Sequence, residues 1–304
     1  MKSEPRAFLV DASIYIFRAW FSLPDRWHTD EGWPLNAVYG YSGFLLDFLE
    51  SVGPGDCCAA AFDESLGSCF RNEIYPDYKA SRELPDETLA FQLAACREIT
   101  ECLGIPSFSS DRYEADDYLA TLARLQREDG WPVTIVTRDK DLGQLLLADG
   151  DRWWDFAGDT ILDAGSFAGR FGVQPRQFAD YLALVGDPVD DIPGVPGVGP
   201  KTAARLLQQF RDLDTLGREL TSVAGLGIRG AARIQAGLIE HWPEVLVARQ
   251  LTALEERGPG LASLPTFELT ASALEAAADY LQQLGIQGAL PRRYRRLAER
   301  GAAA

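Results

Sequence analysis

Nine acidic residues in five short segments are the side chains of this sequence best suited to chemistry. Carboxylates gathered in one small site would repel one another or take up protons. Divalent cations remove this conflict, and ligation by oxygen alone suits Mg²⁺ or Mn²⁺ rather than Zn²⁺. Two such ions, about 3.5–4 Å apart, can hold the attacking water and the leaving oxygen of a phosphodiester. The nine candidate metal ligands are Asp11, Asp63, Glu114, Asp116, Asp117, Asp139, Asp141, Asp187 and Asp190.

Each acidic segment, taken alone, also has an ordinary structural explanation. Acids such as Glu114 are common in the first turn of a helix, where they face the positive end of the helix dipole. Asp139 and Asp141 would form a polar turn with a helix cap. Asp11 and Asp63 would form turns at strand ends. The catalytic interpretation therefore rests on the five segments together.

Three of the acids come directly after predicted strands. Asp11, Asp63 and Asp139 each follow, within two residues, an apolar or β-branched run that is typical of a buried strand. These runs are residues 7–10, 57–62 and 132–137. Helical patterns alternate with them, which predicts an α/β fold with a mostly parallel central sheet and flanking helices. Ligands of open α/β sheets bind beyond the carboxyl ends of the strands, so we expect these aspartates to converge on one sheet edge.

Three further acids open a predicted helix in the run Glu114-Ala115-Asp116-Asp117. At about 100° per residue, Glu114 and Asp117 lie on one face of the helix and Asp116 points elsewhere. One face therefore cannot supply all three as ligands of a single ion. They would serve two neighbouring ions, or one ion and its water shell.

The helical patterns also predict the domain organisation. They occur at residues 13–20, 35–52, 86–103, 114–127, 177–185, 201–210, 231–241 and 271–284. After about residue 175 no strand pattern remains and Gly-rich turns separate the helices. We expect an α/β domain over residues 1–175, a helical subdomain over 176–290 and a basic tail over 291–304. A solvated terminus explains this tail more simply than a phosphate contact does.

A Gly- and Pro-rich turn, GVPGVGPKT at residues 194–202, follows the last two acids. It nearly matches a P-loop, but Pro200 separates Gly199 from Lys201 and no buried strand precedes it, so nucleotide binding is a weak alternative. A hairpin between two helices, with backbone N–H groups facing a phosphate, is the favoured interpretation. An ordinary helix–helix turn would have the same composition.

Composition narrows the class of protein. The formal net charge of −16 argues against a nucleic-acid partner if taken alone, but acids gathered in a metal site would not oppose DNA binding. Two histidines exclude a multi-His metal site. Five cysteines without a CxxC pair predict a reducing, cytoplasmic location. No apolar run approaches the roughly 20 residues of a membrane span, and Glu4 and Asp11 interrupt any signal-peptide core.

Together these segments resemble the 5′ nuclease family, which comprises the 5′→3′ exonuclease domain of bacterial DNA polymerase I, its standalone bacterial relatives and flap endonucleases. The resemblance runs from about residue 8 to about residue 210. It is carried by LVDASIYIFRAW, AFDESLGSCFRNEIYPDYKASR, EADDYLATLA, TRDKDLGQLL and GDPVDDIPGVPGVGPKTA. No polymerase domain follows in this sequence, so it resembles the standalone form. The resemblance implies a PIN-like core with a helix–three-turn–helix subdomain, and metal-dependent hydrolysis of DNA at 5′ ends, flaps and branched junctions.

The resemblance also implies a role for each matching residue. Asp11, Asp63, Glu114 and Asp116 correspond to a first metal group. A second metal group, or ligands held through water, corresponds to Asp117, Asp139, Asp141, Asp187 and Asp190. Basic residues that engage the scissile phosphate correspond to Arg18, Lys79 and Arg82, and residues 79–92 correspond to an arch around single strands. A terminal base would stack on Tyr78. A potassium ion would bind the backbone carbonyls of Leu184, Val185, Pro193, Val195 and Val198, and the DNA duplex would contact Gly197, Gly199, Lys201 and Thr202.

The sequence departs from the family pattern at few positions. Ala12 stands where glycine is usual, and Asp191 where asparagine is common. Arg138 replaces a small residue and would either contact phosphate or crowd the site. Because the set of acids is complete, we expect an active enzyme. We also expect a monomer. The alternatives are a DNA-structure-binding protein with vestigial acids, and a PIN-like ribonuclease, which would not need the hairpin at 194–199.

Overall fold

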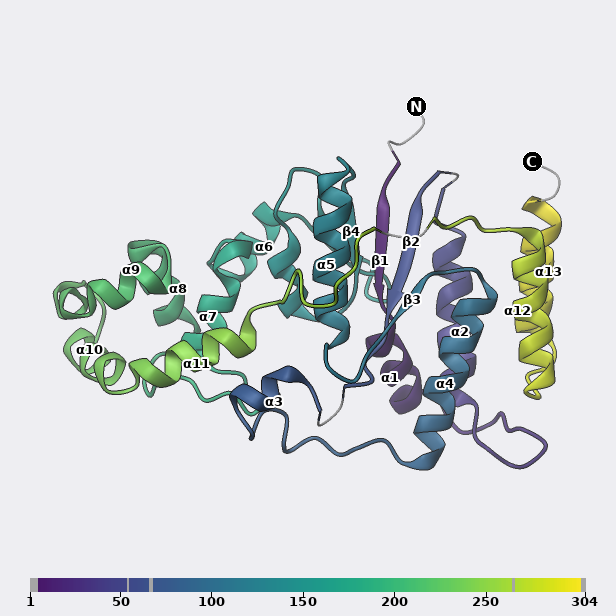
Figure 1. The fold of residues 1–304 in the computed structure, drawn as a ribbon, viewed down its shortest axis with the longest axis horizontal. Helices are drawn as coiled ribbons and strands as arrows, with labels where there is room; N and C mark the ends of the chain where they lie inside the picture. The colour runs from purple at the N-terminus through teal and green to yellow at the C-terminus, as the bar shows by residue number, and fades with distance from the viewer. Residues whose placement is uncertain (1–4, 54, 66–67, 264–265, 302–304) are drawn as a thin grey trace.

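The computed structural model describes residues 5–53, 55–65, 68–263 and 266–301. Its centre is a six-stranded sheet with the order β3-β2-β1-β4-β5-β6 (Figure 1). The strands are β1 (Ala7–Asp11), β2 (Cys57–Ala61), β3 (Ser107–Phe108), β4 (Val133–Val136), β5 (Arg152–Asp155) and β6 (Thr160–Leu162). All neighbouring pairs are parallel except β5 and β6. The predicted α/β fold with a mostly parallel sheet is confirmed.

The eight predicted helices are all present, with ends that differ from the prediction by at most three residues. They are α1 (Ala12–Ser22), α2 (Asn36–Leu49), α4 (Glu87–Cys102), α5 (Ala115–Glu128), α7 (Phe178–Val185), α8 (Pro200–Phe210), α10 (Ala231–Glu240) and α12 (Ala271–Gln283). The sequence patterns missed α3 (Phe70–Ile74), α6 (Ala164–Phe171), α9 (Leu213–Arg218), α11 (Trp242–Thr252), α13 (Ala289–Gly301) and the 3₁₀ turns η1 (Lys140–Leu145), η2 (Pro175–Gln177) and η3 (Leu220–Gly225). Within the described ranges, no helix is both long and apolar enough to cross a membrane.

Alternate residues of the central strand β1 pack into two different layers. Leu9 belongs to the apolar cluster that contains Leu119 of α5. Phe8 and Val10 belong to the opposite cluster, which contains Leu45 of α2. A strand buried on both faces reads as a continuous apolar run, which is why the central strands could be recognised from sequence. This packing fixes the strand ends, where the acids lie.

Helices α7 to α11 lie beside the sheet, and the chain then returns to it (Figure 1). Helix α7 packs against α8 and α11, whereas α12 packs against α4, and α13 against α2 and α12. The predicted helical subdomain therefore ends before α12. The predicted basic tail is wrong for residues 291–301, which belong to α13, because Tyr294 is fully buried and donates a hydrogen bond to the Ser42 carbonyl (2.7 Å). The remainder of that tail, 302–304, lies outside the described residues.

Candidate active site

The carboxyl ends of β2, β1 and β4 carry three of the predicted acids. Asp11 is the last residue of β1, Asp63 follows the end of β2, and Asp139 follows the end of β4. Because β1 lies between β2 and β4, these residues share one edge of the sheet. Burial and the charges of Asp63 and Asp139 raise the pKa of Asp11 to about 7. A shift with this cause requires the carboxylates to lie near one another.

Helix α5 adds Glu114 and Asp116 from the adjacent layer. Glu114 is its N-cap residue and Asp116 lies in its first turn. Burial and the charges of Asp139, Asp11 and Asp63 raise the pKa of Asp116 well above its ordinary value. Asp116 therefore faces the acids of the strand ends. This placement agrees with the prediction that Asp116 points away from the helix face that Glu114 and Asp117 share.

A second group of acids lies around Lys140, in the turn η1. The Lys140 Nζ lies 3.0 Å from Asp141 Oδ1 and 3.0 Å from Asp187 Oδ2. Burial and the charge of Asp139 raise the pKa of Asp141 to about 7. Although Lys140 is near, the buried Asp141 Oδ1 accepts no hydrogen bond of good geometry. A buried carboxylate oxygen without a hydrogen bond is costly and is a suitable ligand for a cation.

Two of the predicted phosphate-binding residues line a cavity of about 330 Å³ beside the acids. Lys79 forms an ion pair with Glu114, and Arg82 forms one with Asp190. The backbone of Lys79 has a φ of 55°, in the left-handed region that residues other than glycine rarely adopt. Although burial favours the neutral amine, the charges of Glu114 and Asp190 raise the pKa of Lys79. These carboxylates therefore hold Lys79 in its charged form.

Arg18, the third predicted phosphate-binding residue, is exposed on α1 and lines a different groove, together with Tyr15 and Phe156. It lies about 10 Å along the helix axis from Asp11, since each residue advances a helix by about 1.5 Å. The structure thus does not bring Arg18 into the cavity that holds the other two basic residues. Arg138, whose role the sequence left open, pairs with Asp155 on β5 (3.2 Å).

The expected stacking of a base on Tyr78 is wrong for this conformation, because the side chain is buried. Only 4% of Tyr78 is exposed, and its hydroxyl donates a hydrogen bond to Glu114 Oε2 (3.0 Å). The ring belongs to the apolar cluster that includes residues of α5, and little of it reaches the cavity that it borders. In this structure, Tyr78 holds a predicted metal ligand in place.

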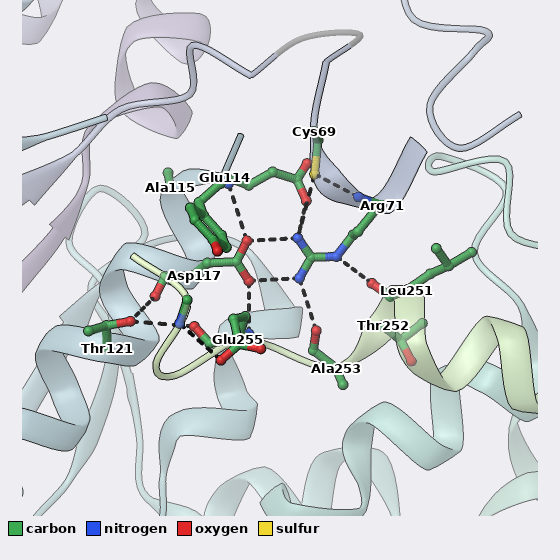
Figure 2. Close-up of polar contacts among 12 residues, drawn as sticks. Cys69, Arg71, Glu114, Ala115, Asp117, Thr121, Leu251, Thr252, Ala253 and Glu255 are labelled. Atoms are coloured by element: carbon green, nitrogen blue, oxygen red, sulfur yellow. Dashed lines mark hydrogen bonds and ion pairs between the residues drawn. The ribbon is translucent and has the colours of Figure 1, made fainter. Parts of the chain in front are cut away.

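Sequence reasoning missed Arg71, a buried residue of α3 that binds two of the predicted ligands. Its guanidinium pairs with Glu114 at 2.8 Å and with both oxygens of Asp117 at 2.7 Å (Figure 2). Asp117 is fully buried, and both of its oxygens accept hydrogen bonds from Arg71 and from backbone N–H groups. This arrangement disagrees with the expectation that Asp117 holds a metal ion directly or through water. The sequence around Arg71 also contains Asn72 and Glu73, so no local pattern distinguishes this arginine from a surface residue.

The Gly-rich turn forms a tight hairpin between α7 and α8. The acidic segment before this turn is closed by a bridge between Asp187 and Ile192. A side chain on Gly194 would place its Cβ 2.0 Å from the Val185 carbonyl oxygen, so only glycine fits. Gly197 has a φ of +86° and is exposed. The residues predicted to bind potassium all lie on this hairpin or at the end of α7, namely Leu184, Val185, Pro193, Val195 and Val198. At the exposed start of α8 lie the predicted DNA contacts Gly199, Lys201 and Thr202.

As they stand, no three His, Cys, Asp or Glu side chains within the described ranges are arranged to hold a metal ion. Lys79 and Lys140 are paired with the carboxylates instead. The donor set nevertheless fits divalent cations such as Mg²⁺, because it consists of oxygens only. Burial and the charges of neighbouring acids raise the pKa of Asp11, as expected for carboxylates that lack a cation between them.

Two family profiles together cover most of the chain. The profile described as 5′-3′ exonuclease, N-terminal resolvase-like domain, matches residues 6–172, and the profile described as 5′-3′ exonuclease, C-terminal SAM fold, matches residues 173–274. Among curated proteins, DNA polymerase I of Rhizobium leguminosarum is 36% identical over 287 residues, which cover 89% of this chain. The thermostable DNA polymerase I of Thermus thermophilus is 39% identical over 218 residues, which cover 72% of this chain. The chain spans 28% and 26% of the lengths of these two relatives.

Solved structures with the same fold include nucleases from outside the polymerases. The T5 D15 protein, co-crystallised with metal ions, matches with a TM-score of 0.66 and 18% identity, covering 98% of this chain and 99% of that one. The catalytic core of Rad2 in complex with DNA substrate matches with a TM-score of 0.62 and 17% identity, covering 92% of this chain and 88% of that one. At these identities the likeness establishes the fold.

Proposed function

The chain belongs to the 5′-3′ exonuclease family, and we propose that it hydrolyses phosphodiester bonds of DNA at 5′ ends and flaps with divalent cations as cofactor. The observation that carries this proposal is the meeting of acids from three strand ends and from α5. These acids raise the pKa of one another. Such a cluster is costly in a protein that does not use it, and perturbed carboxylates of this kind gather at functional sites.

Two groups of acids would hold the cations. The first group contains Asp11, Asp63, Glu114 and Asp116. The second contains Asp139, Asp141, Asp187 and Asp190. When bound, such ions lower the pKa of a coordinated water and offset the charge on the phosphate. Mg²⁺ or Mn²⁺ fits this oxygen-only set, and two ions correspond to the two groups.

Lys79 and Arg82 would orient the phosphate from the opposite wall of the cavity. Both line the same cavity as Asp63 and Glu114. Both are held by Asp190 or Glu114, and each would exchange a carboxylate for a phosphate oxygen as substrate enters. Fixed cations aimed at the reacting group stabilise charge that develops in the transition state.

The hairpin between α7 and α8 would grip the duplex part of the same DNA. Gly197 and Gly199 are exposed and leave the backbone uncovered, and the exposed Lys201 stands in the first turn of α8, where a phosphate would meet the positive end of the helix dipole. A potassium ion on the carbonyls at residues 184–198 would add positive charge beside these amides. DNA that carries a flap would thus meet the hairpin with its duplex and the acids with its 5′ strand.

Cleavage of a labelled 5′-flap DNA, in Mg²⁺ and in EDTA, tests this function. We expect Asp116→Ala to lower the cleavage rate by about a thousandfold or more while the flap DNA still binds. The matched control is Asp129→Ala at the exposed C-terminal end of the same helix, which should cleave like the wild type.

The result can also contradict the proposal. If the wild type binds the flap but does not cut it in Mg²⁺ or Mn²⁺, the chain is a DNA-structure-binding protein. If it cuts a matched RNA substrate in preference to DNA, the PIN-like ribonuclease is the correct assignment. Full activity of Asp116→Ala would remove the acids from the mechanism.

A further inference from the structure

We propose, building on the nuclease function above, that Arg71 is a positioning residue that ties the duplex-binding hairpin to Glu114 and so fixes where on the DNA the cut falls. Arg71 is 1% exposed and therefore cannot touch DNA itself. Any effect of Arg71 on cleavage must act through the groups that it holds.

Every N–H group of the Arg71 guanidinium has an oxygen partner. A guanidinium has five such groups in a fixed planar fork. Nη1 donates to Glu114 Oε2 (2.8 Å) and to Asp117 Oδ2 (2.7 Å). Nη2 donates to Asp117 Oδ1 (2.7 Å) and to the Ala253 carbonyl (2.9 Å), and Nε donates to the Leu251 carbonyl (2.8 Å) (Figure 2). A lysine could not serve these acceptors, because its donors radiate from a single nitrogen.

On one side, the contacts of Arg71 fix the position of Glu114. Arg71 and the Tyr78 hydroxyl both donate to the same oxygen, Glu114 Oε2. Asp117 Oδ2, held by Arg71, accepts a further hydrogen bond from the Glu114 backbone N–H (3.2 Å). Backbone and side chain of Glu114 are therefore both held, and its second oxygen faces Lys79 in the cavity.

On the other side, Arg71 caps the end of α11. The carbonyls of Leu251 and Ala253 lie at the C-terminal end of α11. The last carbonyls of a helix have no partner within the helix, and this end carries partial negative charge. The chain after α11 is also held, since the Glu255 N–H donates to Asp117 Oδ1 (2.9 Å; Figure 2). The Arg71–Asp117 pair thus joins the start of α5 to the end of α11.

Helix α11 connects this pair to the hairpin. It packs against α7, and the hairpin begins directly after α7. The duplex-binding hairpin between α7 and α8 is therefore linked to Glu114 through packed helices and the buried ion pair. This hairpin is called the duplex grip below. One base pair of DNA advances about 3.4 Å along its axis, so a shift of a few ångströms between grip and site moves the cut to a neighbouring nucleotide.

The test is cleavage of a 5′-flap DNA by Arg71→Lys, with products resolved to single nucleotides. We expect kcat to fall about tenfold or more, KM to change little, and products one nucleotide on either side of the wild-type position to appear. Loss of folded protein alone would lower the rate without moving the cut. The matched control is Arg124→Lys. In the wild type, Arg124 donates to the Glu256 carbonyl (3.1 Å) in the segment that follows α11, but it contacts no predicted metal ligand. This variant should retain the wild-type product.

If Arg71→Lys does not fold, Asp117→Asn carries the test, because it keeps Arg71 and the shape of the side chain. We expect the same spread of products from this variant. A wild-type product position in the folded variants would overturn the proposal. So would an Asp117→Asn protein that binds Mn²⁺ more weakly but cuts at the wild-type position, since Asp117 would then be a metal ligand. A wild type that does not cleave at all would instead contradict the nuclease function.

Discussion

Without metal, the folded protein should lose stability as the pH rises from about 5 to about 8. The reason is the cluster at the sheet edge, where burial and the charge of Asp63 raise the pKa of Asp11 to about 7. In the unfolded chain an aspartate has a pKa of about 3.9. The folded state therefore binds the proton more tightly. The stability that this proton provides is fully present below about pH 4 and is lost as the pH rises through 7.

The size of the loss follows from the two pKa values. For Asp11 alone, a change from about pH 5 to about pH 8 lowers the free energy of unfolding by roughly 3 kcal/mol. Burial and the charge of Asp139 raise the pKa of Asp141 to about 7 as well, which acts in the same direction. Neighbouring acids share their protons, so the total should be less than the sum of the separate contributions. Mg²⁺ should restore the stability at pH 8, because a bound cation replaces the protons.

Urea unfolding in EDTA at both pH values measures this loss. Asp11→Asn should flatten the pH dependence, since the amide stays neutral and can still accept the N-cap hydrogen bond from the Ile14 N–H. At pH 8 without metal, this variant should be more stable than the wild type, but it should gain less from Mg²⁺. The control is Asp163→Asn, at the exposed N-cap residue of α6. Hydrogen bonds from Ser166 lower the pKa of Asp163, so this substitution should change the stability at acid pH and not between pH 5 and pH 8. A wild type at least as stable at pH 8 as at pH 5 in EDTA would refute the reasoning.

Two further predictions concern the hairpin and the second group of acids. Gly194→Ala should lower the free energy of unfolding by about 3 kcal/mol, because the added Cβ would stand 2.0 Å from the Val185 carbonyl oxygen. The control is Gly199→Ala, whose Cβ would have no heavy atom within 4 Å and which should melt like the wild type. Equal melting temperatures of the two variants would contradict this prediction. Lys140→Met should tighten Mn²⁺ binding about tenfold, because the Lys140 ammonium of the wild type lies 3.0 Å from Asp187 and would compete with the ion. A spectroscopic titration of free Mn²⁺ measures the affinity, and an unchanged value would exclude this competition.

The parts of the site that could be predicted from sequence are those that follow from element direction. Asp11 and Asp63 follow strands that are buried on both faces, so parallel pairing alone places them at one edge. Helical periodicity also separated Asp116 from the face shared by Glu114 and Asp117. The periodicity could not indicate what that face meets, because the partner Arg71 is far away in the sequence.

Burial of polar groups by distant segments was the main obstacle to prediction. The family resemblance implied that a base stacks on Tyr78, but the side chain is buried in the same apolar cluster as residues of α5, and its hydroxyl donates to Glu114. The strands β3 and β6 have two and three residues, which are too few to show the alternation of apolar and polar residues that distinguishes a strand from a loop. Helix α13 has many arginines, and its buried face includes Leu290, Tyr294 and Ala298, which lie at helical spacing among charged neighbours.

The acids and the phosphate-facing turn are adjacent in sequence, yet they do not oppose each other in space. Asp187 pairs with Lys140, which follows β4, and Asp190 pairs with Arg82, which lies between α3 and α4. The backbone of the same loop is fixed there as well, since the Lys79 N–H donates to the Asp190 carbonyl (3.1 Å). Gly197 and the start of α8 lie beyond the bridge that closes the loop, and they are exposed. A single loop thus carries predicted metal ligands at one end and a predicted phosphate contact at the other. The length of that loop, rather than any base contact, would set the number of nucleotides between the duplex grip and the cut.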